Sequence, residues 1–397
     1  MYERVRNFEK MGFGMFVHFG IYSVLGKGEW SKNRLSIPDE KYFPLMEKFK
    51  VKKTWAKELV SAAKRAGCKY ITLTTRHHDG FSLYDTLGIN EYDAPHSAAG
   101  RDLVREFVDE CNKQGIVPFF YHTLLDWYNK DYDNDFPKYI DYLVKSVEIL
   151  CTQYGKIGGL WFDGFWNKPT ADWQFDRLYA MIRKHQPDAM IINNTGMRER
   201  GTVGHKEIDS VTFERGKPHI QDLGERPVAT EMCQVFASHW GCAYYDVDYK
   251  SLPYMIHELV YCRANNSNFL LNVGPLGNGS IKPLDKAMLF EIGKWIRYNK
   301  NFIYDVRHSE ITAENAIVLE DSKGNIYAAT EVPMISDMGH KGDKDILEVK
   351  LSAKIKSAAW IENGEPIELK DENSYLTTPF EYGTSMHIRV AKIKVKR

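Results

Sequence analysis

Strand-like and helix-like segments alternate through residues 13–301, and this alternation restricts the fold more than any other feature of the sequence. Short apolar runs rich in β-forming residues are mostly followed by stretches with apolar residues at helical spacing. The strands should pair in parallel, because a helix between two strands returns the chain to the same edge of the sheet. The expected strands are 13–20, 70–76, 116–123, 158–164, 189–194, 209–214 and 268–274, and the expected helices are 51–67, 101–115, 139–155, 173–187, 252–267 and 282–301.

Two architectures agree with this alternation. About eight strand–helix units in roughly 300 residues match a (β/α)8 barrel. A doubly wound open sheet is the alternative, but no G-x-G-x-x-G motif follows the first expected strand. We therefore expect an α/β fold with a (β/α)8-like barrel as the catalytic domain, over residues 1–303.

The pattern changes in the last part of the chain. The segment 314–332 predicts a hairpin around Lys323, Gly324 and Asn325, and short strands separated by turns continue through 345–380 and 384–397. This spacing is typical of a small antiparallel β-sandwich. We expect such a C-terminal domain at residues 304–397, packed against the barrel.

Composition argues against several kinds of partner. The chain has 53 Lys and Arg and 53 Asp and Glu, so it lacks the excess positive charge of nucleic-acid and membrane-surface binders. Its N-terminal segment has no apolar stretch of signal-peptide length, and no run reaches the length of a membrane span. None of the six cysteines forms a C-x-x-C pair. We expect a cytoplasmic protein with reduced cysteines, with homo-oligomerisation left open.

Polar residues cluster where the expected strands end. In a parallel barrel these ends open on one face, which is where active sites lie. One such residue would mean little, but clusters after all seven expected strands predict a functional cleft. These residues are His18, Arg76, His77, His78, Asp79, Tyr121, His122, Asp163, Asn193, Asn194, Glu214 and Asn272.

Two carboxylates in an aromatic-rich cleft suit cleavage of a glycosidic bond. Asp163 and Glu214 stand at strand ends, among histidines and asparagines. One carboxylate can attack or stabilise the anomeric carbon, while the other gives a proton to the leaving oxygen and later takes one from water. No G-x-S-x-G motif or Cys–His arrangement indicates acyl transfer.

A metal site is the competing interpretation. His18, His77, His78, His122 and Asp163 could gather around a divalent ion. Metal-dependent barrel hydrolases usually carry an H-x-H pair after the first strand, whereas this chain has a single histidine in FVHFGIY. Adjacent histidines point to opposite faces of a regular strand, but a turn at Asp79-Gly80 would let both face the cleft. We expect no metal and no cofactor.

Five segments together resemble the retaining α-L-fucosidase family of glycoside hydrolases. MFVHFGIYS, GEW, LTTRHHDGFSLYD, GLWFDG and NFLLNVGPLGNGSI occur in this order between Phe13 and Asn301. The resemblance implies a (β/α)8-like barrel followed by a β-sandwich. It also implies an exo-acting, retaining α-L-fucosidase that acts on fucosylated oligosaccharides or glycoconjugates without a cofactor.

The resemblance also implies roles for individual residues. Asp163 in WFDG matches the nucleophile that forms a covalent fucosyl-enzyme. Glu214 in DSVTFERG matches the acid/base, with Glu231 in ATEMCQV as the second candidate and Glu29 as the third. The residues that match contacts to the sugar or to the surroundings of the nucleophile are His18, Glu29, Trp30, His77, His78, Tyr121 and Trp161.

One segment departs from the family pattern. Many members carry Asn-Asp-Arg-Trp after the fifth strand, and Thr195 stands here where the sugar-contacting arginine is expected. Arg215 is a candidate replacement. Two other hypotheses stay open at this point, a metal-dependent barrel hydrolase and a non-catalytic sugar-binding homologue.

Overall fold

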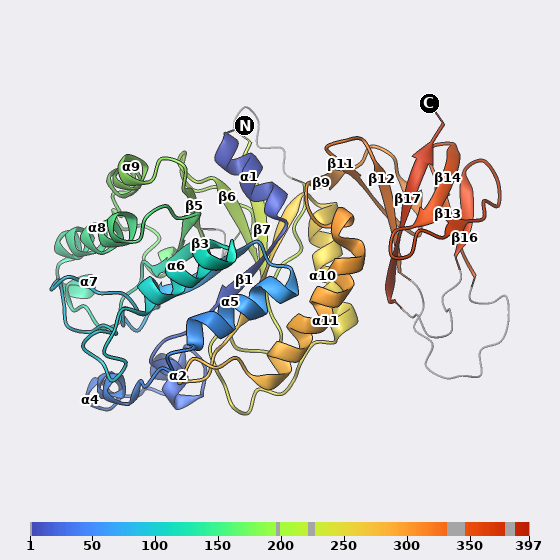
Figure 1. Cartoon of the computed structure of the whole chain (residues 1–397). Coiled ribbons are helices and arrows are strands. Elements are labelled where there is room, and N and C mark those ends of the chain that lie inside the picture. Colours follow the sequence, from blue (N-terminus) through green and yellow to red (C-terminus); the bar gives the residue numbers. More distant parts are fainter. Residues whose placement is uncertain (1, 196–198, 221–226, 332–345, 378–385, 397) are drawn as a thin grey trace.

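The structure is a computed structural model that describes residues 2–195, 199–220, 227–331, 346–377 and 386–396. Eight parallel strands close into a barrel in chain order, as expected (Figure 1). Parts of the predicted C-terminal strands, at 332, 345, 378–380, 384–385 and 397, lie outside the described residues. The barrel strands are β1 (Phe13–Val17), β2 (Tyr70–Arg76), β3 (Val117–Thr123), β4 (Gly159–Asp163), β5 (Met190–Asn193), β6 (Ser210–Glu214), β7 (Ala229–Val235) and β8 (Ser267–Val273).

Six long helices surround the barrel, and α1 (Glu3–Met11) precedes it (Figure 1). Among the described residues, no helix lies between β5 and β6 or between β6 and β7. No described helix is both long and apolar enough to cross a bilayer. The six helices are α5 (Trp55–Ala66), α6 (Leu103–Gln114), α8 (Phe136–Gln153), α9 (Phe175–His185), α10 (Leu252–Ala264) and α11 (Pro283–Asn299).

Local sequence explains where several of these helices begin and end. Asp102 accepts a hydrogen bond from the Arg105 amide at the start of α6, and Ser251 accepts one from the Tyr254 amide at the start of α10. Gly67 ends α5 in the left-handed region at φ +92°, which costs glycine little. Short helical segments in the connections are α2 (Tyr22–Leu25), α3 (Ser31–Arg34), α4 (Asp39–Tyr42), η1 (Phe43–Lys48), α7 (Asp131–Asn134), η2 (Phe165–Asn167) and η3 (Lys300–Phe302).

The C-terminal domain consists of two antiparallel sheets, which confirms the predicted sandwich (Figure 1). It packs against the barrel, since the Trp295 indole in α11 donates to the Ile388 carbonyl at 3.0 Å. Six strands in the order β15-β14-β17-β12-β11-β9 face three in the order β10-β13-β16. They are β9 (Val306–His308), β10 (Ala313–Glu314), β11 (Ile317–Asp321), β12 (Ile326–Glu331), β13 (Leu347–Leu351), β14 (Ile355–Trp360), β15 (Pro366–Ile367), β16 (Ser374–Thr377) and β17 (Ile388–Val395).

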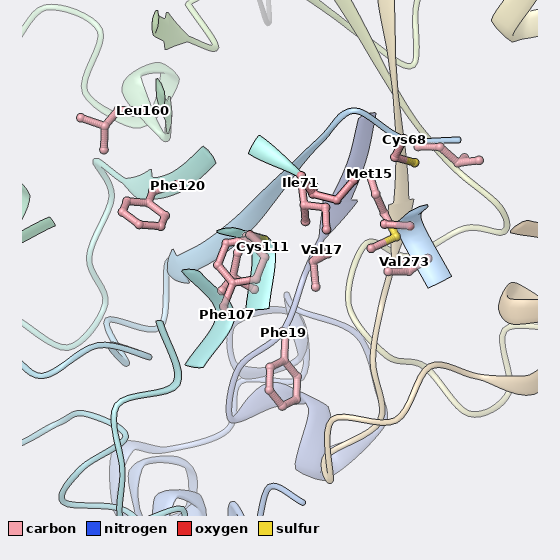
Figure 2. Packing of buried hydrophobic residues seen from close by; sticks show 14 of the residues in the cluster. Met15, Val17, Phe19, Cys68, Ile71, Phe107, Cys111, Phe120, Leu160 and Val273 are labelled. Atoms are coloured by element: carbon pink, nitrogen blue, oxygen red, sulfur yellow. The ribbon is translucent and has the colours of Figure 1, made fainter. Parts of the chain in front are cut away.

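Alternation along the barrel strands divides the apolar residues into two cores. One set points outward and packs under the helices, as Met15, Ile71 and Phe120 do in Figure 2. The other set, which includes Phe16 and Trp161, fills the barrel interior. The same alternation directs alternate residues at the strand ends into one cavity.

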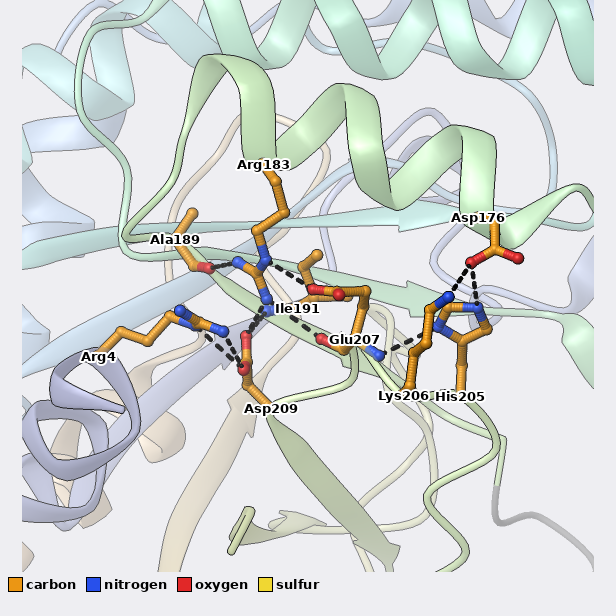
Figure 3. A network of polar contacts seen from close by, with 9 residues as sticks. All are labelled: Arg4, Asp176, Arg183, Ala189, Ile191, His205, Lys206, Glu207 and Asp209. Atoms are coloured by element: carbon orange, nitrogen blue, oxygen red, sulfur yellow. Dashed lines mark hydrogen bonds and ion pairs between the residues drawn. The ribbon is translucent and has the colours of Figure 1, made fainter. Parts of the chain in front are cut away.

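A buried ion-pair network ties α1 and α9 to the start of β6 (Figure 3). Asp209 is fully buried, and its carboxylate meets Arg4 at 3.0 Å and Arg183 at 2.6 Å. It also accepts the Ile191 amide at 3.0 Å. Removing one member of a buried pair leaves uncompensated charge, which usually costs far more than a surface pair contributes.

We expect Asp209→Ala to lower the free energy of unfolding by about 3 kcal/mol or more, because Arg4 then loses its carboxylate and Arg183 keeps only that of Glu207. Asp176→Ala is the matched control from the same network, since its exposed carboxylate pairs only with His205 and Lys206 in Figure 3. Chemical denaturation measures both variants. Equal midpoints for the two would contradict the structural role of Asp209.

Candidate active site

A small cavity lies at the carboxyl ends of the barrel strands and gathers most of the predicted site residues. Its lining residues come from six of the strands and the loops that follow them: Phe16, His18, Trp30, His77, His78, Tyr121, Trp161, Asp163, Trp166, Glu214, Cys233 and Trp240. A larger hollow of about 600 Å³ lies at the opposite end of the barrel beside α1, and none of the predicted site residues lines it.

Asp163 ends β4 and is surrounded by hydrogen-bond donors. Its Oδ2 accepts from the Tyr121 hydroxyl at 3.1 Å, and its Oδ1 accepts from the Trp166 indole at 3.2 Å. The His78 Nε2 lies 3.5 Å from Oδ2. Burial raises the pKa of Asp163, but His78 and the other donors outweigh it, so the pKa lies below its ordinary value. The carboxylate is therefore ionised at neutral pH.

Glu214 ends β6 and has the opposite electrostatic character. Burial raises the pKa of its carboxyl to about 7, and the charge of Asp163 adds to the rise. Asn194 connects the two carboxyls, since its Nδ2 lies 2.8 Å from the Glu214 Oε2 and 3.2 Å from the Asp163 Oδ1. A carboxylate and a carboxylic acid thus face the same cavity near neutral pH.

The hydrogen bonds around His18 fix its proton. The Asn272 side-chain nitrogen donates to the Trp240 carbonyl at 2.7 Å, so the Asn272 oxygen accepts from the His18 Nδ1 at 2.7 Å. Burial lowers the pKa of His18 to about 3, which keeps the ring neutral. Its Nε2 is then a hydrogen-bond acceptor within the cavity.

His77 and His78 both reach the cavity, because the backbone leaves the regular strand after Thr74. The pairing of β2 with β3 shifts between Thr74 and Arg76, and Gly80 closes a turn onto the His77 carbonyl at φ +79°. The two imidazoles lie with ring centres 4.2 Å apart. The buried Nδ1 of His77 has no hydrogen-bond partner among the described residues.

His78 is held from behind by Thr123. The Thr123 hydroxyl donates to the Leu125 carbonyl at 2.5 Å, so its oxygen accepts from the His78 Nδ1 at 2.7 Å. This arrangement turns the His78 Nε2 toward Asp163. Among the neighbours of Asp163, His78 has the largest effect in lowering the pKa of that carboxyl.

Sequence reasoning missed four residues of the cavity wall, Phe16, Trp166, Cys233 and Trp240. Trp166 lies three residues after Asp163 and stands beside Trp30, with ring centres 5.7 Å apart. Trp240 stacks on His18 at 5.2 Å from the loop after β7. Cys233 comes from β7 itself. The GFWN segment directly after β4 is the signal that could have revealed Trp166.

Other predicted residues lie outside the cavity lining. His122 was expected in the cleft, which is wrong, because it follows the inward-facing Tyr121 and points outward to the Tyr84 hydroxyl at 3.3 Å. Glu29 lies buried behind the cavity wall and accepts the Gly241 amide at 2.7 Å. Glu231 is buried in the barrel interior, where its carboxyl accepts from the Trp161 indole at 2.9 Å.

The two residues connected with the missing family arginine do not line the cavity either. Thr195 donates to the Thr202 carbonyl at 3.0 Å. The Arg215 guanidinium lies 4.9 Å from the ring centre of Trp240 and donates to the Ser238 carbonyl at 2.7 Å. Arg215 therefore supports the Trp240 wall from outside. Within the described residues, no three side chains of His, Cys, Asp or Glu are grouped to hold a metal ion.

A closed (β/α)8-like barrel with paired carboxyls in an aromatic- and histidine-lined cavity at its carboxyl face defines a glycoside hydrolase. A family model described as alpha-L-fucosidase matches residues 2–301. The chain belongs to the α-L-fucosidase family.

Individual relatives agree with this assignment. The chain is 26% identical to an alpha-L-fucosidase of Dictyostelium discoideum, over 90% of this chain and 86% of that one. It is 27% identical to the tissue alpha-L-fucosidase of Bos taurus, over 81% and 73%. The solved structure of alpha-L-fucosidase isoenzyme 1 from Paenibacillus thiaminolyticus has a TM-score of 0.86 and 28% identity, and the match covers 100% of this chain and 99% of that one.

Proposed function

We propose that this protein is an exo-acting, retaining α-L-fucosidase that releases terminal α-L-fucose from glycans or glycoconjugates, with Asp163 as nucleophile and Glu214 as acid/base. The pair of carboxyls bridged by Asn194 carries the proposal. The two N–H bonds of one amide diverge by about 120°, so contacts of 3.2 and 2.8 Å place the two carboxyl oxygens about 5 Å apart. Retaining glycosidases hold their carboxyls at about this distance, whereas inverting enzymes leave room for a water molecule.

The different protonation of the two groups supports the division of roles. A nucleophile has to be ionised, and the donors around Asp163 keep its pKa low. A general acid has to be protonated at the working pH, and burial beside Asp163 raises the pKa of Glu214 to about 7. Glu231 fits the acid role less well, because its carboxyl is buried away from the cavity and already engaged by Trp161 and Tyr70.

In the first step an oxygen of Asp163 attacks the anomeric carbon of the fucoside. The bond from that carbon to the leaving oxygen breaks, and Glu214 transfers its proton to this oxygen. The products are a fucosyl ester on Asp163, an ionised Glu214 and the free aglycone. The aglycone departs from the side of the cavity on which Glu214 stands.

In the second step water replaces the ester. Glu214 takes a proton from the water as its oxygen attacks the anomeric carbon, and the bond to Asp163 breaks. Fucose leaves with the α configuration, and both carboxyls return to their starting states. Two inversions at one carbon give net retention.

Neutral imidazoles suit the recognition of sugar hydroxyls. The His18 Nε2 can accept from one hydroxyl, and the His77 ring, which also lines the cavity, can bond another. The faces of Trp30 and Trp166 offer apolar surface for the methyl group of a deoxy sugar. These contacts favour a monosaccharide held by one end, which is the arrangement of an exo-acting enzyme.

A panel of fucosylated oligosaccharides that covers the common linkages tests this function. We expect release of free fucose from terminal α-L-fucosides, with the same rate before and after treatment with EDTA. Binding of fucose without turnover would identify a non-catalytic homologue. Activity that EDTA removes and a divalent metal restores would identify a metal-dependent hydrolase.

A further inference from the structure

Among the described residues, only Asn194 contacts both carboxyls of the site, and it does so through its side-chain amide. Its Nδ2 donates one hydrogen to the Asp163 Oδ1 at 3.2 Å and the other to the Glu214 Oε2 at 2.8 Å. Asn194 follows β5 directly, with its side chain turned into the barrel, and is 1% exposed. Both hydrogens of the amide are thereby committed to the catalytic pair.

Thr212 fixes which end of the amide faces the carboxyls. Its hydroxyl donates to the Asn194 Oδ1 at 2.8 Å, so the amide oxygen is engaged on the side away from the cavity. Thr212 is 2% exposed and lies two residues before Glu214, on the same inward face of β6. A flipped amide would set its oxygen against two carboxyl oxygens and would lose the Thr212 hydrogen bond.

The neutrality of this donor matters for the reaction cycle. In the free enzyme the negative charge is on Asp163, and in the fucosyl-enzyme it is on Glu214. A lysine or arginine between the two would stabilise both ionised forms and would take the proton from the general acid. An amide supplies one hydrogen bond to each carboxyl and strengthens whichever one is charged.

We propose that Asn194, oriented by Thr212, is a positioning residue that sets the separation of Asp163 and Glu214 and donates to whichever carboxyl carries the charge. This inference rests on the proposed function, because it assigns a role within the pair that performs the double displacement. It also gives Thr212 an indirect role in the reaction, which Thr212 exerts only through its hydrogen bond to Asn194.

Asn194→Ala should lower kcat/KM about 10- to 100-fold, the effect of losing a hydrogen bond to a charged group. The pH profile distinguishes the loss of a positioning residue from a general loss of folded enzyme. Each lost N–H had stabilised a carboxylate, so both limbs of the kcat/KM profile should move to higher pH, by roughly one unit. A variant that is only partly folded would have a lower kcat/KM at every pH, and both limbs of its profile would stay at the wild-type pH.

Thr212→Val tests the orienting hydrogen bond, because valine keeps the shape and lacks the hydroxyl. We expect the same alkaline shift of both limbs, smaller than in Asn194→Ala, and its reversal in Thr212→Ser. Thr72→Val is the matched control, since Thr72 is a buried threonine of β2 whose hydroxyl has no partner among the described residues. Its profile should equal that of the wild type.

The outcomes distinguish this inference from the proposed function. If the wild type is a retaining fucosidase but Asn194→Ala and Thr212→Val keep both limbs in place, the positioning role is wrong and the function stands. If the wild type releases fucose with inversion, or not at all, the proposed function fails before any variant is compared. Matching thermal midpoints across the variants exclude a folding defect as the cause of a shift.

Discussion

Replacing Asp163 with alanine should abolish release of fucose from an aryl α-L-fucoside, with a loss of roughly a thousandfold or more. The variant lacks the oxygen that attacks the anomeric carbon, and no other side chain takes its place. Added azide should restore turnover, because a small anion fits the space left by the carboxylate. The rescued product should be the β-fucosyl azide, since only one inversion then occurs.

Asp163→Asn provides the control for this experiment. It keeps the size of the side chain and one oxygen that can accept from the Trp166 indole, while the Tyr121 hydroxyl can turn to accept from the new amide, so the site should stay folded while turnover is lost. Azide should rescue it poorly, because the amide still fills the space. Full activity in Asp163→Ala, or rescue that yields the α-azide, would be incompatible with Asp163 as the nucleophile.

Glu214→Ala should separate substrates by their leaving groups. General acids contribute about 10²- to 10⁴-fold, and this contribution is needed only where the leaving oxygen is too basic to depart alone. We expect a loss of that order on fucosylated oligosaccharides and a much smaller loss of the first step on activated aryl fucosides. Measured kcat/KM across a series of leaving groups gives the comparison.

The pH profile adds a second readout for Glu214. Its carboxyl must be protonated for the first step, so wild-type kcat/KM should fall as the pH rises through about 7, where this group ionises. That limb should be absent from Glu214→Ala with an activated substrate. The acid limb should remain, because Asp163 still has to be ionised.

Glu231→Gln and Glu29→Gln test the two other candidates for the acid. Glutamine at 231 can still accept from the Trp161 indole, so this variant should show no dependence on the leaving group. If Glu29→Gln lowers activity, it should do so to the same extent for every leaving group. A steep dependence on the leaving group in either variant would move the acid/base role away from Glu214.

The alternation of apolar runs and helices was sufficient to predict the barrel, but β7 (Ala229–Val235) was missed. Its sequence, ATEMCQV, places Glu231 and Gln234 within seven residues, and such a run does not look apolar. Glu231 is tolerated there because its carboxyl is hydrogen-bonded to Tyr70 and Trp161 inside the barrel. Gly14 leaves space for the ring of Tyr70, whose hydroxyl donates to Glu231. These are tertiary contacts, which the local pattern does not encode.

The predicted site shows the same limit. The rule that functional residues stand at strand ends brought His18, His77 and Asp163 together correctly in one cavity. It placed His122 there as well, because position at a strand end does not say which face of the strand a side chain takes. The bridge made by Asn194 depends on the lateral distance between three strands, and no spacing in the sequence specifies it.

Trapping the intermediate tests the central claim most directly. A 2-deoxy-2-fluoro-fucosyl fluoride carries a good leaving group, while its fluorine slows hydrolysis of the ester, so the fucosyl-enzyme should accumulate. Peptide mass spectrometry should then find one added fluorofucosyl group, on the peptide that contains Asp163. A label on Glu214 or another residue would contradict the account, as would the absence of any label from an enzyme that consumes the reagent.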